Sequence, residues 1–241
     1  MVAISIVVPT LNEERYLPAL LRSIKAQSFK DHEVVVSDSQ SKDRTRQIAR
    51  RFGVKVVTGP KKGPGAGRNL GARYAKGEIL LFLDADTVLR NRNTLSSLYN
   101  RTRDKTVLCG GIAYLPKNPN IHEALLYLAG NLTSFFGAAI NRPFTPGFCM
   151  FKRAKAFRKV GGFDEGIKWG EDIELSLRTI KKLGGKSAYV LPAAENSVRR
   201  FRTDGFLKTL DIYLKCVYYV YILGRPEKIV LKFKPASSKN F

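Results

Sequence analysis

Two aspartates separated by one residue carry the clearest chemical signal in this sequence of 241 residues. Asp84 and Asp86 directly follow the apolar run 79–83, which predicts a buried β-strand. On an extended chain, side chains at i and i+2 point to the same side, and two carboxylates there repel unless a cation or a proton compensates. Oxygen ligands of this kind suit Mg²⁺ or Mn²⁺. We therefore predict a divalent metal site here; the alternative is a turn whose aspartates cap the next helix.

Polar side chains also follow the first two predicted strands, at residues 3–8 and 33–36. The first strand runs into Pro9-Thr10-Leu11-Asn12-Glu13, and the second runs into Ser37-Asp38. Ligands of an open parallel sheet bind beyond the carboxyl ends of its strands, so these groups should gather at the edge that carries Asp84. Asp38 could accept a hydrogen bond there from a nucleobase or a ribose.

A loop rich in glycine, proline and lysine covers residues 59–67 and precedes a helix predicted to begin at Arg68. Backbone N–H groups and the helix dipole at such a helix start favour phosphate. The loop matches neither the dinucleotide-binding pattern nor the P-loop, so those modes of phosphate binding are unsupported. A flexible loop without a ligand is the alternative.

Apolar runs that alternate with amphipathic stretches predict the elements that position these groups. Strands are expected at residues 3–8, 33–36, 54–57, 79–83, 107–114 and 148–151. Helices are expected at residues 13–28, 43–52, 68–75, 94–103, 172–183 and 206–223. The alternation is typical of βαβ units and predicts an α/β fold with a mostly parallel sheet flanked by helices. We expect one catalytic domain over residues 1–203, followed by an amphipathic helix and basic tail over residues 204–241.

The charge balance is strongly basic, with 42 Lys and Arg against 20 Asp and Glu and a net charge of +22. This excess predicts attraction to polyanions such as nucleic acid, anionic lipid headgroups or phosphorylated substrates, unless it only solvates the surface. A nucleic-acid binder should interleave aromatic and basic residues on one face. Here the cations are dispersed, and such a function leaves Asp84 and Asp86 unexplained. We therefore expect no specific nucleic-acid partner, and a non-catalytic polyanion binder stays as the alternative of another class.

Cysteine usage and the first residues bear on the compartment. The three cysteines are far apart and only two histidines are present, which predicts free thiols and no zinc site. The apolar N-terminus runs into a predicted strand without a cleavage site, so we expect no signal peptide. A cytoplasmic protein is the interpretation that fits both features.

Six segments, in this order, resemble glycosyltransferase family 2, a large group with the GT-A fold. They cover the chain from about Val2 to Arg202. They are VVPTLNEE at 7–14, VSDSQSKDRT at 36–45, GRNLGA at 67–72, LFLDADT at 81–87, GGFDE at 161–165 and GEDIEL at 170–175. The second segment carries Ser39-Gln40 where the family usually has glycines. The processive QxxRW motif is replaced by residues 196–201, which favours transfer of a single sugar over polymer synthesis.

The resemblance implies a metal-dependent, inverting glycosyltransferase that moves a sugar from a UDP- or GDP-sugar to an acceptor hydroxyl or phosphate. Residues 1–115 would bind the nucleotide-sugar, and residues 116–203 would bind the acceptor and carry out catalysis. Asp172, together with Glu171, would be catalytic, with Asp172 as the general base; a simple helix N-cap is the alternative for Asp172. Asp86 would bind Mn²⁺ or Mg²⁺ directly, and Asp84 would sit near the ribose and the metal. The other implied donor-binding residues are Pro9, Thr10, Leu11, Glu13, Asp38, Arg68, Ala85, Arg199 and Arg200.

Two segments bear on membranes and on the acceptor. Residues 124–141 contain no charged residue and approach the length of a bilayer span, but polar and glycine residues dilute them, which predicts a buried or interfacial helix near the acceptor site. The predicted helix 206–223 carries Lys208, Asp211 and Lys215 among apolar residues. It could dock on anionic lipid or pack on the core.

The basic residues Lys228, Lys232 and Lys234 follow this helix and favour a membrane surface. We therefore expect a lipid-linked acceptor such as a polyprenyl phosphate, with a soluble saccharide or other small acceptor as the alternative. The corresponding location is the cytoplasm, with peripheral attachment to the cytoplasmic face of the membrane.

Overall fold

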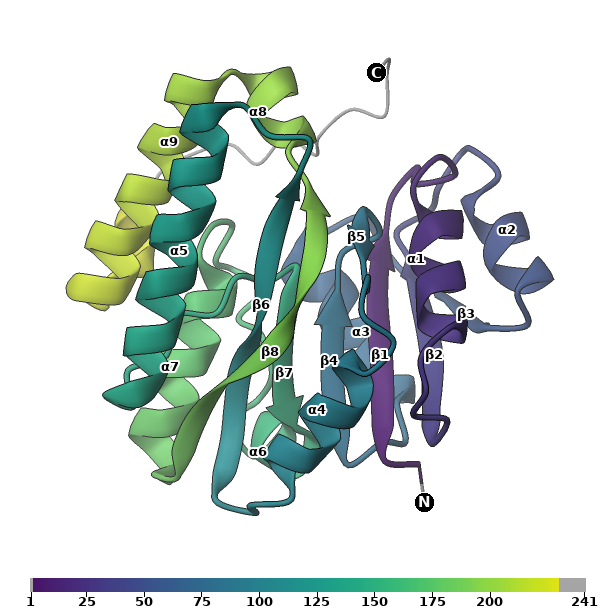
Figure 1. The fold of residues 1–241 in the computed structure, drawn as a ribbon, viewed down its shortest axis with the longest axis horizontal. Helices are drawn as coiled ribbons and strands as arrows, with labels where there is room; N and C mark the ends of the chain where they lie inside the picture. The colour runs from purple at the N-terminus through teal and green to yellow at the C-terminus, as the bar shows by residue number, and fades with distance from the viewer. Residues whose placement is uncertain (1, 230–241) are drawn as a thin grey trace.

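The structure, a computed structural model, describes residues 2–229 and contains one mixed sheet with helices on both faces (Figure 1). The strand order is β3-β2-β1-β4-β7-β6-β8-β5. The strands are β1 (Ile4–Thr10), β2 (His32–Asp38), β3 (Lys55–Thr58), β4 (Ile79–Leu83), β5 (Thr87–Val88), β6 (Val107–Lys117), β7 (Cys149–Arg153) and β8 (Lys186–Ser197). The helices that flank the first strands are α1 (Leu17–Lys25), α2 (Thr45–Arg51), α3 (Pro64–Tyr74) and α4 (Thr94–Thr102). The later helices are α5 (Ile121–Ala139), α6 (Ala154–Lys159), α7 (Glu171–Leu183), α8 (Arg199–Asp204), α9 (Phe206–Lys215), its π-helical continuation η1 (Cys216–Ile222) and the short 3-10 turn η2 (Pro226–Lys228).

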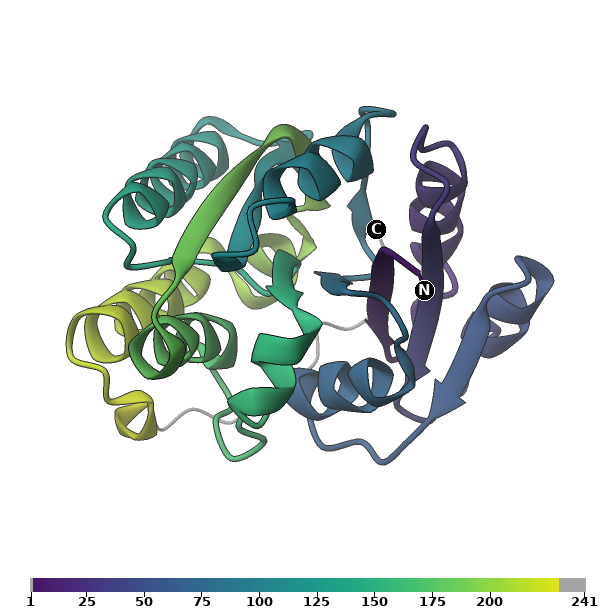
Figure 2. The same cartoon turned by 90° about the horizontal axis from the view of Figure 1, so that it is seen from below.

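The first half of the sheet is parallel, as the alternation of runs predicts. β1 pairs with β2 and β4, and β2 pairs with β3, all in parallel. Side chains of β1 alternate between the two faces, so Ile6 and Val8 join the core under α1 and α4, while Val7 packs with α3 and α6. Figure 2 shows α1, α4 and α5 over one face and α3, α6 and α7 over the other. Both faces of these strands are covered, which explains why their sequences are continuous apolar runs.

The second half of the sheet is mixed. β7 is antiparallel to β4 and β6, β8 is parallel to β6, and β5 is antiparallel to β8. Neither β5 nor β8 is among the predicted strands. β8 contains Pro192, Glu195 and Asn196, which disfavour a strand locally, and it is held in the sheet by its long pairing with β6.

Two helix starts differ from the predictions by four residues. α1 begins at Leu17, because the backbone N–H of Glu13 donates to the hydroxyl of Thr45 and ties this segment to the start of α2. α3 begins at Pro64, four residues before the predicted start, since proline suits the first turn of a helix. Gly65 and Gly67 of the predicted phosphate loop therefore lie within α3, and Gly63 is its N-cap. A Cβ at Gly71 would lie 2.4 Å from Cγ1 of Val7, so small residues allow α3 to approach β1.

The C-terminal helix packs on the core with one face. Ile212, Cys216 and Val220 of α9 and η1 lie against Ile173 of α7. Within residues 2–229, the structure has no helix that is both long and apolar enough to cross a bilayer. All three cysteines are buried with free thiols. Lys232 and Lys234 of the predicted basic tail lie outside the described residues.

Candidate active site

The Asp84-Ala85-Asp86 segment forms a turn at the carboxyl end of β4. The strand ends at Leu83, and the backbone N–H of Thr87 donates to the Asp84 carbonyl at 3.0 Å. The prediction that both aspartates continue an extended strand is therefore wrong, because the chain reverses here to bring β5 against β8. The alternative is also wrong, since the next helix begins only at Thr94 and no side chain of the turn caps it. Ala85 is buried beneath the turn.

Arg68 joins Asp84 to the predicted catalytic pair. Its guanidinium is buried, with Nη2 2.9 Å from Oδ1 of Asp84 and Nη1 2.8 Å from Oε1 of Glu171. The side chain of Glu171 is also buried, whereas that of Asp84 is 38% exposed. Burial and the neighbouring Asp172 raise the pKa of Glu171 above its ordinary value, against the opposing charge of Arg68. Arg68 therefore links Asp84, a predicted donor-binding residue, to Glu171, a predicted catalytic residue. It does so from within helix α3 and not from a loop.

Gly147, in the loop before β7, lies closely against this arginine and Asp172. Its backbone N–H donates to Oδ2 of Asp172 at 2.5 Å, and a Cβ placed on it would lie 2.7 Å from Nη2 of Arg68. Glycine therefore allows the main chain to reach Asp172 while the guanidinium keeps its place between two carboxylates.

We expect Gly147→Ala to displace the guanidinium of Arg68 and to lower both stability and the rate of transfer. Overpacking a filled site costs about 1–3 kcal/mol, which corresponds to a melting temperature lower by roughly 2–12 °C. Calorimetry and a transfer assay check this. The matched control is Gly111→Ala, because the nearest atom to a Cβ there is 3.8 Å away. Equal melting temperatures for the two variants would contradict the crowding at Gly147.

Asp172 lies in the first turn of α7 with a half-buried side chain. Besides the bond from Gly147, its Oδ1 accepts from the backbone N–H of Ile173 at 2.8 Å. The helix N-cap is Gly170, so the alternative in which Asp172 is the cap is wrong. Burial raises the pKa of the Asp172 carboxyl above its ordinary value, while Arg68 opposes the shift. The result is a carboxylate that two backbone N–H groups orient.

A second arginine joins the other acidic residues. Arg199, at the start of α8, places Nη1 and Nη2 at 2.9 and 2.7 Å from the two carboxylate oxygens of Glu13. Its Nε lies 3.0 Å from Oδ2 of Asp86, and its guanidinium lies 4.7 Å from the centre of the Tyr16 ring. Burial raises the pKa of Glu13 to about 7, against the opposing charge of Arg199. Three predicted donor-binding residues from distant segments thus lie together.

Thr10 and Asp38 are buried at the ends of β1 and β2. The hydroxyl of Thr10 donates to Oδ2 of Asp38 at 3.1 Å, and Ser41 donates to Asp38 from its backbone N–H at 3.0 Å and its hydroxyl at 2.5 Å. Pro9 and Leu11 are partly buried on either side of Thr10. Here Asp38 holds the loop after β2 against β1, and its contact with a nucleoside stays a prediction.

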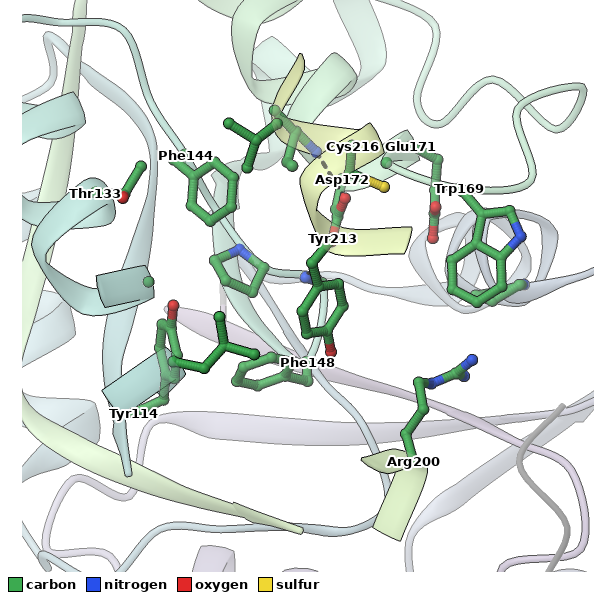
Figure 3. Close-up of a pocket in the computed structure, with 18 of the residues that line it drawn as sticks. Tyr114, Thr133, Phe144, Phe148, Trp169, Glu171, Asp172, Arg200, Tyr213 and Cys216 are labelled. Carbon is green, nitrogen blue, oxygen red and sulfur yellow. Dashed lines mark hydrogen bonds between the residues drawn. The ribbon is translucent and has the colours of Figure 1, made fainter. Parts of the chain in front are cut away.

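A cavity of about 340 Å³ ends at Arg68, Asp84, Glu171 and Asp172. Arg200 also lines it, with its guanidinium carbon 5.1 Å from the centre of the Trp169 ring (Figure 3). The rest of the wall is largely apolar and aromatic. It includes Tyr114, Leu126, Phe144, Phe148, Tyr213, Leu214, Cys216 and Val217. The cavity thus joins a charged end to an apolar body.

Several lining residues were not among the predicted site residues. Three of them, from separate parts of the chain, are Gly147, Trp169 and Tyr213. Only Trp169 could have been predicted as a site residue from the sequence, because it directly precedes the segment 170–175. Behind Asp172, the buried ammonium of Lys152 donates to the Ser176 hydroxyl at 2.5 Å, and that hydroxyl is 2.8 Å from the Asp172 carbonyl. This support could not be inferred from spacing, because β7 and α7 meet only in the folded chain.

Solved glycosyltransferases share this arrangement of strands and helices. TarS from S. aureus superposes with a TM-score of 0.67 and 22% identity, over 96% of this chain and 76% of that chain. Mannosyltransferase PcManGT from Pyrobaculum calidifontis, solved with GDP-Man and Mn²⁺, superposes with a TM-score of 0.66 and 20% identity, over 88% of this chain and 64% of that chain. The fold is therefore that of the GT-A glycosyltransferases, which confirms the predicted fold class.

The sequence comparison defines the family. Residues 5–161 match the family described as Glycosyl transferase family 2, and the chain belongs to this family. The 4,4'-diaponeurosporenoate glycosyltransferase of Staphylococcus haemolyticus is 42% identical over 103 residues, which are 40% of this chain and 27% of that protein. The GalNAc(5)-diNAcBac-PP-undecaprenol beta-1,3-glucosyltransferase of Campylobacter jejuni is 31% identical over 130 residues, which are 51% of this chain and 42% of that protein. The chain thus spans less than half of the length of either relative.

Proposed function

We propose that this protein transfers a single sugar from a UDP- or GDP-linked donor to an acceptor that carries an apolar group. The observation that carries this proposal is the position of Asp172, whose oriented carboxylate lies at the charged end of a largely apolar cavity. Membership of the family supports sugar transfer. The apolar wall supports an acceptor with a hydrocarbon portion, such as a polyprenyl phosphate or another lipid-linked compound.

The geometry supports a direct displacement with Asp172 as the general base. Asp172 would take the proton of an acceptor hydroxyl while the acceptor oxygen bonds the anomeric carbon. The bond from that carbon to the donor phosphate breaks, and the nucleoside diphosphate leaves with the electron pair, which inverts the anomeric centre. An acceptor phosphate, already ionised, would not need this base. Arg199 and Arg200 supply positive charge near the site for the leaving diphosphate.

The carboxylates of the β4–β5 turn fit a hard divalent cation. Asp86 would bind Mn²⁺ or Mg²⁺ with Asp84 beside it, and the bound metal would neutralise charge on the leaving diphosphate. Within residues 2–229, no three His, Cys, Asp or Glu side chains are grouped to hold a metal, so the donor phosphates and water would complete the ligand set. Arg199 lies 3.0 Å from Asp86, and a cation would therefore compete with its guanidinium for this carboxylate.

The acceptor class has two candidates. The C. jejuni relative is named for an undecaprenol-linked acceptor, which agrees with the apolar wall of the cavity. A saccharide is the second candidate, because Trp169 and Tyr213 present aromatic rings near Asp172 (Figure 3). Binding of a polyanion without catalysis, the alternative of another class, would leave the oriented carboxylate of Asp172 without a use.

We expect one nucleoside diphosphate to raise the melting temperature in a metal-dependent manner. Ligand at a hundredfold excess over its Kd should add about 2.7 kcal/mol, or roughly 5–10 °C for a chain of this size. UDP, GDP and other nucleoside diphosphates are compared by thermal shift with and without Mn²⁺. Asp86→Asn should remove the metal-dependent part, because the substitution removes a charged oxygen ligand.

The matched control is Asp211→Asn, a neutralisation on α9 at an exposed side chain that does not line the cavity. It should leave the shift unchanged. If no nucleotide shifts the wild type while oligonucleotides do, the proposal of sugar transfer is wrong and the basic surface is the functional feature.

A further inference from the structure

The helix α5 is amphipathic in the opposite sense to an ordinary surface helix. Most of its polar residues face the protein: Glu123 and Ser134 are buried, and Asn131 accepts from the backbone N–H of Tyr114 and donates to the Tyr114 carbonyl. Most of its large apolar side chains face outward. Together with Ile140, which directly follows the helix, the outward residues are Ile121, Leu125, Leu128, Leu132, Phe135 and Phe136, each between 48% and 69% exposed. A contiguous exposed face of this kind marks an interaction surface.

The helix α9 and its continuation η1 add a second apolar ridge beside the first. The ring of His122 lies 5.8 Å from that of Phe206 near the starts of the two helices. Near their ends, a Cβ on Gly137 would lie 3.0 Å from the hydroxyl of Tyr221. The two helices therefore run side by side in the same direction along one edge of the molecule (Figure 1). The exposed apolar residues of this ridge are Leu207, Leu214, Tyr218, Ile222 and Leu223.

Cations lie at both ends of this pair of helices. At the starting end, exposed Arg202 donates to the Asn118 carbonyl at 2.7 Å, and Lys208 is exposed on α9. At the other end, exposed Arg142 donates to the Tyr221 carbonyl at 2.5 Å, close to exposed Arg225. The chain as a whole carries a net charge of +22. An apolar face bordered by cations matches the interface of an anionic bilayer, with hydrocarbon beneath and negative headgroups around it.

Both helices also line the cavity of the candidate site. Ala129 and Leu214, one from each helix, line it and are exposed to solvent. Asp172 lines the same cavity at its charged end. A bilayer covering both ridges would therefore lie beside the part of the cavity that Ala129 and Leu214 line.

We propose that the outward faces of α5 and of α9 with η1 form a docking surface for an anionic lipid bilayer. The helices lie along the interface, with Leu128 and Leu132 of one ridge and Leu207 and Ile222 of the other in contact with acyl chains. α5, with 19 residues, is about 28 Å long, so docking along its length engages the whole face. The proposal of a docking surface rests on the exposed residues of these helices and does not depend on the identity of the donor or of the sugar.

Vesicle flotation without nucleotide or acceptor tests the docking surface apart from sugar transfer. Vesicles of phosphatidylcholine with phosphatidylglycerol are compared with phosphatidylcholine alone, at about 0.1 M and about 0.5 M NaCl, because salt screens the headgroup charge. The wild type should bind the anionic vesicles and bind more weakly at high salt. Leu128→Glu/Leu132→Glu, and separately Leu207→Glu/Ile222→Glu, should each lower the partition coefficient at least about tenfold. None of the four side chains lines the cavity.

The control is Tyr74→Glu, which places a single glutamate at an exposed aromatic residue on α3. It should bind vesicles like the wild type, and circular dichroism of all variants should superpose. The proposal is overturned if the wild type does not float, or if both double variants float as well as the wild type. Light scattering after size exclusion measures the oligomeric state. A wild-type dimer that does not bind vesicles, and that the α5 variant converts to a monomer, would assign the face to a second copy of the chain. This result would also overturn the proposal.

Discussion

Asp172→Asn is expected to lower kcat for sugar transfer by about 10²–10⁴-fold, the usual contribution of a general base, while donor binding is retained. The asparagine keeps the shape of the side chain and one oxygen that can accept from Gly147, so the site should stay assembled. What is lost is the ability to take the acceptor proton. Initial rates with a hydroxyl acceptor measure kcat, and the thermal shift with the nucleoside diphosphate measures donor binding.

The pH profile separates a base from a residue that only supports the fold. Burial raises the pKa of Asp172, so the wild-type rate should fall as the pH is lowered through that raised pKa, where the carboxyl becomes protonated and cannot accept a proton. The residual rate of the variant should lack this limb. Loss of donor binding together with the rate would instead identify Asp172 as a structural residue, and retention of most of the rate would place the base elsewhere.

Arg68→Met is expected to lower the free energy of unfolding by about 3–5 kcal/mol, the cost of leaving a buried charge without its partner. The guanidinium is buried against Glu171, whose side chain is only 9% exposed, so little water can replace the lost partner. The melting temperature should fall by roughly 6–20 °C. Denaturant unfolding measures the free energy, and transfer activity should fall as well, since Arg68 also contacts Asp84 at the cavity.

The double variant Arg68→Met/Glu171→Gln tests whether the lost stability comes from this pair. Removing the second charge should restore part of the stability, so the two effects should not add. Arg44→Met is the surface control, because its ion pair with Glu14 is largely exposed and is worth about 0–1 kcal/mol. If Arg68→Met costs no more than this control, the bridge is not a structural element of the site.

Much of the first half of the fold can be predicted because its signals are local. The run Ile79–Leu83 is a strand in the structure with the predicted bounds, since a strand covered on both faces needs an uninterrupted apolar sequence. The strand β8 could not be predicted in the same way. Pro192, Glu195 and Asn196 have little strand preference of their own, and the long parallel pairing with β6 holds them in the sheet.

The candidate site likewise has features that can be predicted from the sequence and features that only the folded chain shows. The types of residue and their order along the chain indicate the family and single out Asp84, Asp86 and Asp172, because each motif is a short segment whose members are neighbours in sequence. The partners of these carboxylates are not neighbours. Arg68 reaches Glu171 across 103 residues and Arg199 reaches Glu13 across 186, and these pairs form only where buried elements meet.

The sequence by itself determined the fold class and the family, and it named the acidic candidates for the site, because these depend on local apolar patterns and short motifs. Only the tertiary structure decided how the charges pair and which way α5 faces. A stretch without charged residues indicates a buried or interfacial helix, but not which side is turned outward. In the folded chain, β6 and β8 provide hydrogen-bond partners for Asn131 and Tyr127, so the polar side turns inward and the leucines are left at the surface.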